Sequence, residues 1–226
     1  MNENKIGLNV RTFRNVVIRN SELCDNVLVA DDSFISGCKI EENVVVERRS
    51  MLFNSRIGAY STLGWNDVVR NAEIGKYCSI AWNCTIGGAE HFLHRLSTSF
   101  FPFEKRYGII DEDIDCVGDP YAKPVDVGND VWIAAGAQVL RGVKVGDGAV
   151  LGGGTIVTKD VPPYEIWAGV PGKKIGQRFS DEIIADLLDI EWWNLRVEVI
   201  KENIDLFRKD IDLELLKEIK QRLHND

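Results

Sequence analysis

Aliphatic residues recur along the first part of the chain in steps of five and six. From Ile18 to Ile86 the steps run five, six and six, and this order repeats four times, so that position i recurs at i+17. An α-helix would space apolar residues by three or four positions and a half-buried strand by two. Steps of six fit neither pattern. The positions are Ile18, Leu23, Val29, Ile35, Ile40, Val46, Leu52, Ile57, Leu63, Val69, Ile74, Ile80 and Ile86, with Ile6 and Thr12 in phase before them.

This repeat predicts a solenoid. It resumes at Val127 and runs in steps of six to Val157, with a small residue often second and a small or β-branched residue fifth in each unit. We interpret each step as a short strand followed by a corner, so that three sides close one coil. The aliphatic residue would point inward and stack on the next coil, as in other solenoids. We expect the small residues at the second and fifth positions to let the chain turn.

Residues 87–126 interrupt the repeat. A loop of this length inside a compact domain is usually functional, and this one contains His91 and His94, two of the three histidines in the chain. Neutral imidazole titrates near physiological pH, so it can accept and return a proton during catalysis. A solenoid wall has no cleft of its own. The loop is therefore expected to build one together with a neighbouring surface.

Helical spacing begins at about residue 178. Ser180 suits the start of a helix, and a third helix is expected from about Asp212. Trp192 and Trp193 are expected to anchor the packing of this region. We therefore divide the chain into a solenoid at 1–177, with its loop at about 87–126, and C-terminal helices at 178–226. The first two helices would bury Ile183, Ile184, Leu187 and Leu188, then Val197, Ile200, Ile204 and Phe207.

The charge and composition narrow the functional classes. The net charge of −8 argues against nucleic acid, which needs a basic face. The sequence has no apolar run long enough for a membrane span and no signal-peptide pattern at its start. Its five cysteines form no CxxC pair, and an odd number argues against a complete disulfide framework. These features predict a cytoplasmic protein without a membrane span.

Several segments carry a family resemblance. The units VGNDVW, IAAGAQ, VGDGAV and LGGGTI resemble those of the hexapeptide-repeat acyltransferases. The segments GGAEHFLHRLSTSFFPF and RFSDEII…DLLDIEWWN are similar to the xenobiotic acetyltransferase group, which includes streptogramin and type B chloramphenicol acetyltransferases and sugar acetyltransferases. The resemblance implies an all-β, left-handed parallel β-helix with an extended loop and a short C-terminal α-helical appendage.

The same resemblance implies roles for individual residues. His91 takes the place of the catalytic histidine, and His94 remains the second candidate for the base. The acceptor is expected to meet Glu90, Trp132 and Tyr107. The resemblance also implies acetyl-CoA as cosubstrate, no metal, and a homotrimer with each active site between neighbouring subunits. The residues that the resemblance places against CoA are Ala135, Gly153, Thr158 and Lys159, and Lys174 is added as a cation close to the end of the coils that can meet the phosphates of CoA.

We therefore expect an acetyltransferase that transfers acetyl from acetyl-CoA to a hydroxyl or amine of a sugar, nucleotide-linked or part of a polysaccharide. Three alternatives remain open. The first is the same reaction with an antibiotic as the acceptor. The second is a zinc hydratase like the γ-class carbonic anhydrases, which would need about three protein ligands, and His91, His94 and Cys116 would have to supply them. The third is a non-catalytic scaffold, which would have no use for His91.

Overall fold

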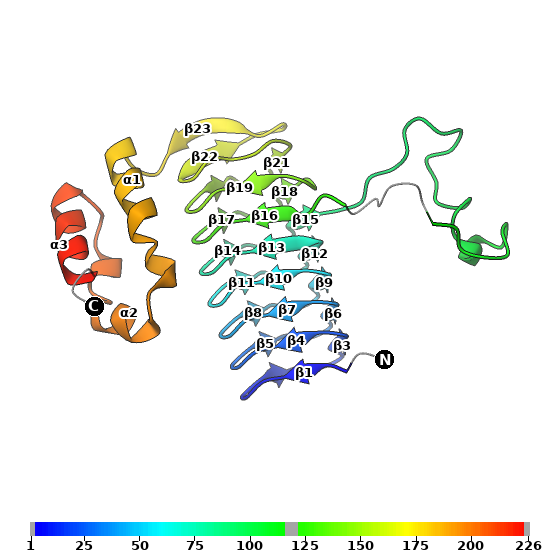
Figure 1. The fold of residues 1–226 in the computed structure, drawn as a ribbon, viewed down its shortest axis with the longest axis horizontal. Helices are drawn as coiled ribbons and strands as arrows, with labels where there is room; N and C mark the ends of the chain where they lie inside the picture. Colours follow the sequence, from blue (N-terminus) through cyan, green and yellow to red (C-terminus); the bar gives the residue numbers. More distant parts are fainter. Residues whose placement is uncertain (1–2, 116–121, 224–226) are drawn as a thin grey trace.

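The computed structural model describes residues 3–115 and 122–223, in which short strands wind into a three-sided solenoid (Figure 1). Each side is a sheet of parallel strands, except that the last strand of sheet B, β23, runs antiparallel. Sheet A contains β1 (Lys5–Ile6), β4 (Glu22–Leu23), β7 (Lys39–Ile40), β10 (Arg56–Ile57), β13 (Ala72–Ile74), β16 (Val125–Val127) and β19 (Lys144–Val145). Sheet B contains β2 (Arg11–Thr12), β5 (Leu28–Val29), β8 (Val45–Val46), β11 (Thr62–Leu63), β14 (Ser79–Ile80), β17 (Trp132–Ile133), β20 (Val150–Leu151), β22 (Glu165–Ala168) and β23 (Lys173–Gln177). Sheet C contains β3 (Val17–Arg19), β6 (Phe34–Ser36), β9 (Met51–Phe53), β12 (Val68–Arg70), β15 (Thr85–Gly87), β18 (Gln138–Val139) and β21 (Ile156–Val157).

The fold is the predicted left-handed parallel β-helix, and the register of its sheets confirms the stacking of the repeat. In sheet C, Ile35 lies beside Leu52, and Val69 lies beside Ile86, each pair one coil apart. Across the loop the column continues from Ile86 to Val139. The inward residues of the central coils are almost completely buried, with 0% of Leu52 and Ile86 exposed. The aliphatic repeat therefore forms one continuous core, in which each coil covers the next.

The corners turn at a different residue of the repeat from the one expected. The fourth residue of the unit takes the left-handed conformation, with φ of 59° at Asn26 and 58° at Tyr77. Asparagine and glycine tolerate this conformation better than other residues. The second residue is small for another reason. A Cβ on Gly75 would lie 2.5 Å from the carbonyl oxygen of Gly128 on the next coil, so coil stacking excludes it.

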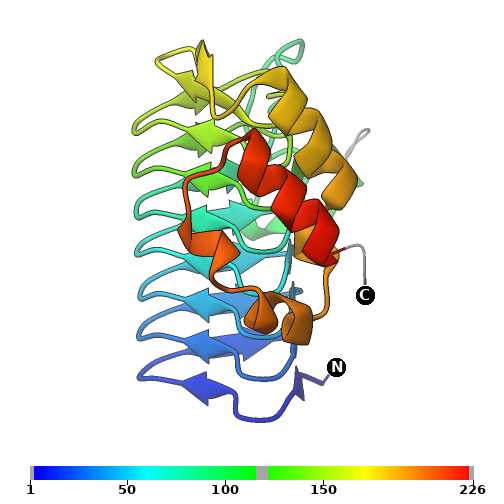
Figure 2. The same ribbon diagram turned by 90° about the vertical axis from the view of Figure 1, so that its left-hand side faces the viewer.

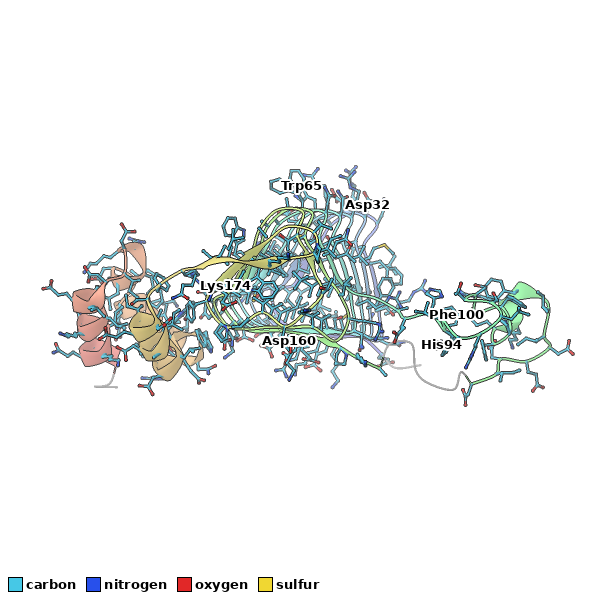
Figure 3. The ribbon with its side chains drawn as sticks, turned by 90° about the horizontal axis from the view of Figure 1, so that it is seen from above. Asp32, Trp65, His94, Phe100, Asp160 and Lys174 are labelled. Atoms are coloured by element: carbon cyan, nitrogen blue, oxygen red, sulfur yellow. The ribbon has the colours of Figure 1, made fainter. Side chains whose placement is uncertain are left out.

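The three corners differ in what covers them. We call the corner between sheets A and B the helix corner, because the C-terminal helices lie against it (Figures 1 and 2). The corner between sheets C and A is the loop corner, from which the excursion leaves after β15. The corner between sheets B and C, which is labelled by Trp65 and Asp32 in Figure 3, is the open corner. In a single copy, the described residues of the helices and of the loop therefore leave the open corner uncovered.

The C-terminal appendage consists of short helices, with the predicted tryptophan anchors. Ser180 Oγ accepts a hydrogen bond from Ile183 N at the start of the first helix, as expected. Trp192 contacts Tyr77 of the helix corner with ring centroids 4.8 Å apart, and Trp193 is buried. The elements are α1 (Asp181–Ile190), η2 (Trp192–Asn194), α2 (Val197–Glu202), η3 (Leu206–Arg208) and α3 (Leu213–Leu223).

The second helix is shorter than expected, and a further pair of strands follows the last coil. The second helix ends at Glu202, so Ile204 and Phe207 lie beyond it. Asn203 follows, and its side-chain amide donates to Val199 O at 3.0 Å, a local bond that competes with helix continuation. The segment after the last coil continues the strand ladder. It adds β22 to sheet B and returns as the antiparallel strand β23. The division of the chain into domains at residues 177 and 178 stays a prediction.

Candidate active site

The excursion projects away from the solenoid on the side opposite the helices (Figures 1 and 3). Within residues 87–115 the excursion forms a small aromatic cluster. The Phe92 ring lies 5.8 Å from that of Phe103, and the Arg95 guanidinium lies 3.7 Å from the Phe92 centroid. At the root of the loop, Glu90 forms an ion pair with Arg141 of the loop corner. The loop is thus a folded arm with an anchored base.

His91 has a defined orientation on this arm. Its Nδ1 lies 2.7 Å from the backbone oxygen of Thr98, and its ring packs against Phe100 at a centroid distance of 4.8 Å. A carbonyl oxygen can only accept a hydrogen bond, so Nδ1 must carry the proton. The neutral ring then has its lone pair on Nε2. The side chain is exposed, so Nε2 is accessible to a molecule that approaches the arm.

The other predicted residues of the loop have different surroundings. His94 is exposed and lies on the projecting arm, away from the corner that carries Trp65 (Figure 3). Tyr107 belongs to the short helix η1 (Lys105–Tyr107), and its hydroxyl accepts from Arg106 Nη2 at 3.5 Å. Glu90 is engaged by Arg141, which gives it a role in holding the arm. One copy of the chain does not bring these residues to its own open corner.

The open corner carries the small residues that were expected to line a CoA slot. Ala135 and Gly153 occupy the same place on successive coils, joined by the hydrogen bond from Gly154 N to Ala135 O at 2.9 Å. A Cβ on Gly153 would meet only Ala135 O, at 3.4 Å, and one on Gly154 would meet nothing within 4 Å. The backbone here is open to a ligand that lies along it. Thr158 and Lys159 follow β21 and are exposed at the loop corner of the same coil as Gly153.

Two predicted residues lie elsewhere. Trp132 projects from sheet B beside Ser79 and is 53% exposed. Lys174 lies on β23, toward the helical side of the solenoid in Figure 3. Its ammonium donates to Glu165 Oε1 at 2.7 Å, and this bond helps to hold the pKa of Glu165 below its ordinary value although burial of that carboxyl opposes it. Lys174 therefore already has an anionic partner.

A cavity of about 280 Å³ lies between the appendage and the helix corner. Its lining is mainly apolar, with Leu187, Trp192 and Leu215 among its residues. Among residues 3–115 and 122–223, no three His, Cys, Asp or Glu side chains are grouped so that they could hold a metal ion. Cys116 and His224 lie outside the described residues. The described part of the chain also contains no helix with the length and hydrophobicity of a membrane span.

Sequence reasoning did not identify what orients His91. The Thr98 carbonyl and the Phe100 ring perform this task, and backbone carbonyls leave no signature in a sequence. The ion pair between Glu90 and Arg141 was also missed, because its partners lie on opposite sides of the excursion in the sequence. Cysteines, by contrast, behave as expected. The four that the structure describes are free thiols, three of them buried: Cys24, Cys38, Cys78 and Cys84.

Short parallel strands in three sheets and a corner of small residues make the coils after the loop similar to hexapeptide repeats. Residues 124–159 match the family model described as bacterial transferase hexapeptide (six repeats), which confirms the resemblance for the coils after the loop. A chloramphenicol acetyltransferase of Klebsiella aerogenes is 56% identical over 75 residues, 33% of this chain and 36% of that protein. The galactoside O-acetyltransferase of Escherichia coli K12 is 47% identical over 58 residues, 26% of this chain and 29% of that protein.

The chain thus spans well under two thirds of the length of these relatives. Among solved structures, the polySia-specific acetyltransferase NeuO aligns over 80% of this chain and 90% of its own, with 23% identity and a TM-score of 0.41. The relatives include proteins named for antibiotic acceptors and proteins named for sugar acceptors.

Proposed function

We propose that this protein is an acetyl-CoA-dependent acetyltransferase that acts on a hydroxyl or amine of a sugar, with His91 as general base. The orientation of His91 is the observation that carries the proposal. Its Nδ1 proton is held by Thr98 O at 2.7 Å, which leaves Nε2 able to accept a proton from an acceptor. The named acetyltransferase relatives and the hexapeptide repeats support the same activity.

Acetyl transfer needs a residue that accepts the proton of the acceptor and then donates a proton to the leaving thiolate. Bound acetyl-CoA supplies an acetyl thioester. As the acceptor oxygen or nitrogen attacks the thioester carbonyl carbon, Nε2 of His91 accepts the proton that the acceptor loses. When the carbon–sulfur bond breaks, the imidazolium returns a proton to the thiolate. The products are the acetylated acceptor, free CoA thiol and neutral His91.

The open corner fits the extended arm of CoA. Gly153 and Gly154 leave room beside the backbone, since a Cβ on either residue would meet at most one atom within 4 Å. Thr158 and the cation of Lys159 are exposed in the same coil, where they can meet the polar part of CoA. Lys174, in contrast, would first have to leave Glu165. We therefore assign the slot to Ala135, Gly153, Thr158 and Lys159.

A second copy of the chain would complete the site. The arm exposes apolar side chains, with 76% of Leu93 and 65% of Ile109 accessible, and exposed apolar groups of this kind mark interaction surfaces. Outward positions of sheet A are mostly charged, as at Lys39 and Arg56, whereas sheets B and C carry outward apolar residues such as Met51. We propose a homotrimer in which the His91 arm of one subunit reaches the open corner of the next.

An antibiotic O-acetyltransferase is the second candidate, because the chloramphenicol acetyltransferase of Klebsiella aerogenes is 56% identical over its aligned segment. Both functions place the protein in the cytoplasm, with the acetyl-CoA pool. The test is a panel of sugars and antibiotics with acetyl-CoA, followed by release of free thiol. Turnover with a sugar supports the first function and turnover with chloramphenicol the second. If no acceptor turns over and acetyl-CoA does not bind, the proposed activity is wrong.

Replacing Gly153 with leucine should raise the KM for acetyl-CoA by at least about 10-fold, because the side chain would fill the slot. The fold should survive, since a Cβ at this position makes only one contact, at 3.4 Å. Steady-state kinetics and isothermal titration with acetyl-CoA measure the effect. Gly176→Leu on β23 is the matched control, because Gly176 also has open space around it. Equal affinities for acetyl-CoA in the two variants would place the slot elsewhere.

A further inference from the structure

Two tryptophans lie on the open corner, on the coils just before the small residues. Trp65 is 46% exposed and Trp82 is 55% exposed, a large accessible area for indole side chains. Large aromatic side chains usually bury most of their surface in a core or an interface. Neither residue is used by the fold in this way, nor by the chemistry assigned to His91. Their exposure therefore indicates a binding role.

Backbone hydrogen bonds show that these residues form one column with the proposed slot. Asn83 N donates to Trp65 O at 2.8 Å, and Gly136 N donates to Trp82 O at 3.0 Å. Gly154 N donates to Ala135 O in the same way. The column therefore reads, from the N-terminal end, Trp65, Trp82, Ala135 and Gly153. The change from small to large side chains occurs between Ala135 and Trp82, so an extended arm that lies on the small residues must end near Trp82.

The arm with His91 leaves the solenoid at this same level. It begins after β15, which belongs to the same coil as Trp82. In a symmetric assembly with parallel axes, the arm of one subunit meets its neighbour near the level at which it departs. The reacting group of a cosubstrate on Ala135 and Gly153 would therefore lie beside Trp82. The space over Trp82 and Trp65 is then where the acceptor must lie.

The polar groups around the tryptophans indicate the chemical class of that acceptor. Glu47 Oε2 accepts a hydrogen bond from Trp65 Nε1 at 3.2 Å, and the Arg48 guanidinium lies 4.9 Å from the Trp65 ring centroid. Asn66 Nδ2 donates to Asn83 Oδ1 at 3.0 Å, so a row of amides runs beside the rings. A pyranose has an apolar face of C–H groups and a rim of hydroxyls. It matches aromatic faces flanked by carboxylate and amide groups, since ligand sites combine apolar walls with a few polar groups that fix orientation.

We propose that Trp65 and Trp82 form the acceptor platform, on which a pyranose ring of the sugar lies face-on while its hydroxyls meet Glu47 and the amides of Asn66 and Asn83. This proposal rests on the proposed acetyltransferase function and adds the residues that select its acceptor. Two stacked positions, one coil apart, suit an acceptor with at least two linked rings. Such an acceptor would lie parallel to the solenoid axis, in line with the slot.

The test compares Trp82→Ala and Trp65→Ala with Phe13→Ala. Phe13 is also an exposed aromatic at the open corner, 52% accessible, but it lies on the first coil. Maltose and an aryl β-galactopyranoside serve as sugar probes, with chloramphenicol as the non-sugar probe. Binding to the acetyl-CoA-free protein is followed by isothermal titration, and acetyl transfer by thiol release. Circular dichroism checks that each variant is folded.

We expect Trp82→Ala to weaken sugar affinity about 10-fold and to raise the acceptor KM similarly. The acetyl-CoA affinity of this variant should be unchanged, and Phe13→Ala should behave as wild type. If acetyl-CoA binds and turns over while Trp82→Ala and Trp65→Ala bind sugar as wild type does, the platform is wrong and the acetyltransferase stands. If wild type binds chloramphenicol but neither sugar, the acceptor class is wrong. If wild type does not bind acetyl-CoA at all, the proposed function itself fails.

Discussion

Replacing His91 with alanine should lower the rate of acetyl transfer by about 10²- to 10⁴-fold, the usual contribution of a positioned general base. The ring contacts Thr98 and Phe100 on its own arm, and the residue is exposed. Its loss should therefore leave the solenoid and the open corner intact. The acetyl-CoA affinity should stay at the wild-type value while kcat falls. Thiol release at saturating acetyl-CoA, together with isothermal titration, separates the two quantities.

His94→Ala is the matched control for this result, because His94 is also exposed and lies on the same arm, three residues after His91. It should retain a rate within about two-fold of wild type, as expected for a residue outside the chemistry. The opposite pattern, with His94→Ala inactive and His91→Ala fully active, would identify His94 as the base. If both variants keep the wild-type rate, neither histidine is the general base.

The second large effect concerns a carboxyl group inside the solenoid. Asp67 is completely buried behind the open corner, and its Oδ1 accepts a hydrogen bond from Cys84 N at 2.8 Å, while Oδ2 has no partner among the described residues. One coil earlier, the hydroxyl of Ser50 takes the same place and donates to Gly64 O. Asp67 can donate in this way only when it is protonated. Burial raises its pKa from 3.8 to about 7, although the bond from Cys84 opposes the shift.

This shift makes the stability of the protein depend on pH. Because the folded pKa lies above the unfolded one, the folded chain binds more protons between pH 3.8 and about pH 7. The extra stability is fully present below the unfolded pKa and is lost as pH rises through the folded pKa. A shift of this size corresponds to about 4 kcal/mol in the free energy of unfolding. The protein should therefore be more stable at pH 5 than at pH 8 through this group.

Asp67→Asn should remove most of this dependence. The asparagine keeps an acceptor for Cys84 N and gains a permanent donor at the position of Oδ2. We expect it to be more stable than wild type at pH 8 by up to about 4 kcal/mol and to change little between pH 5 and pH 8. Urea denaturation at several pH values and one protein concentration measures the difference. Asp126→Asn, at an exposed position of sheet A, is the control. A parallel pH dependence of Asp67→Asn and wild type would show that Asp67 is ionised in the folded state.

The spacing of aliphatic residues was sufficient to predict the solenoid, because every coil buries its aliphatic residues in the same way. Each aliphatic position stacks on its copy in the next coil, as Ile35 does on Leu52. The column of the open corner was harder to see, because the excursion separates Trp82 from Ala135 in the sequence. The strand register, with Ile80 beside Ile133, and the hydrogen bond from Gly136 N to Trp82 O show that these coils are neighbours. Trp65 and Trp82 thus escaped the sequence-based assignment of acceptor residues.

The details of the arm and of the appendage could not be predicted from the sequence, because they depend on contacts that the spacing of apolar residues does not reveal. The orientation of His91 is fixed by the backbone carbonyl of Thr98. The second helix stops because Asn203 bonds back to Val199, although the apolar spacing continues to Phe207. Lys174 was grouped with the CoA-contacting residues by sequence proximity to the last coil, but the antiparallel return of β23 places it beside Glu165. The slot, the base and the platform remain proposals that variants can test.

The most direct measurement combines His91→Ala and Gly153→Leu in one assembly, assayed at an acetyl-CoA concentration well below the KM of Gly153→Leu. His91→Ala has an intact slot, and Gly153→Leu has an intact arm, so a subunit pair with one of each can form a working site only if the site spans two copies. Co-expression of differently tagged chains and purification of the mixed trimers should restore about a third of wild-type sites, because one of the three sites in each mixed trimer joins an intact arm to an intact slot. No recovered activity in verified mixed trimers would contradict the shared site and would place His91 and its slot in the same chain.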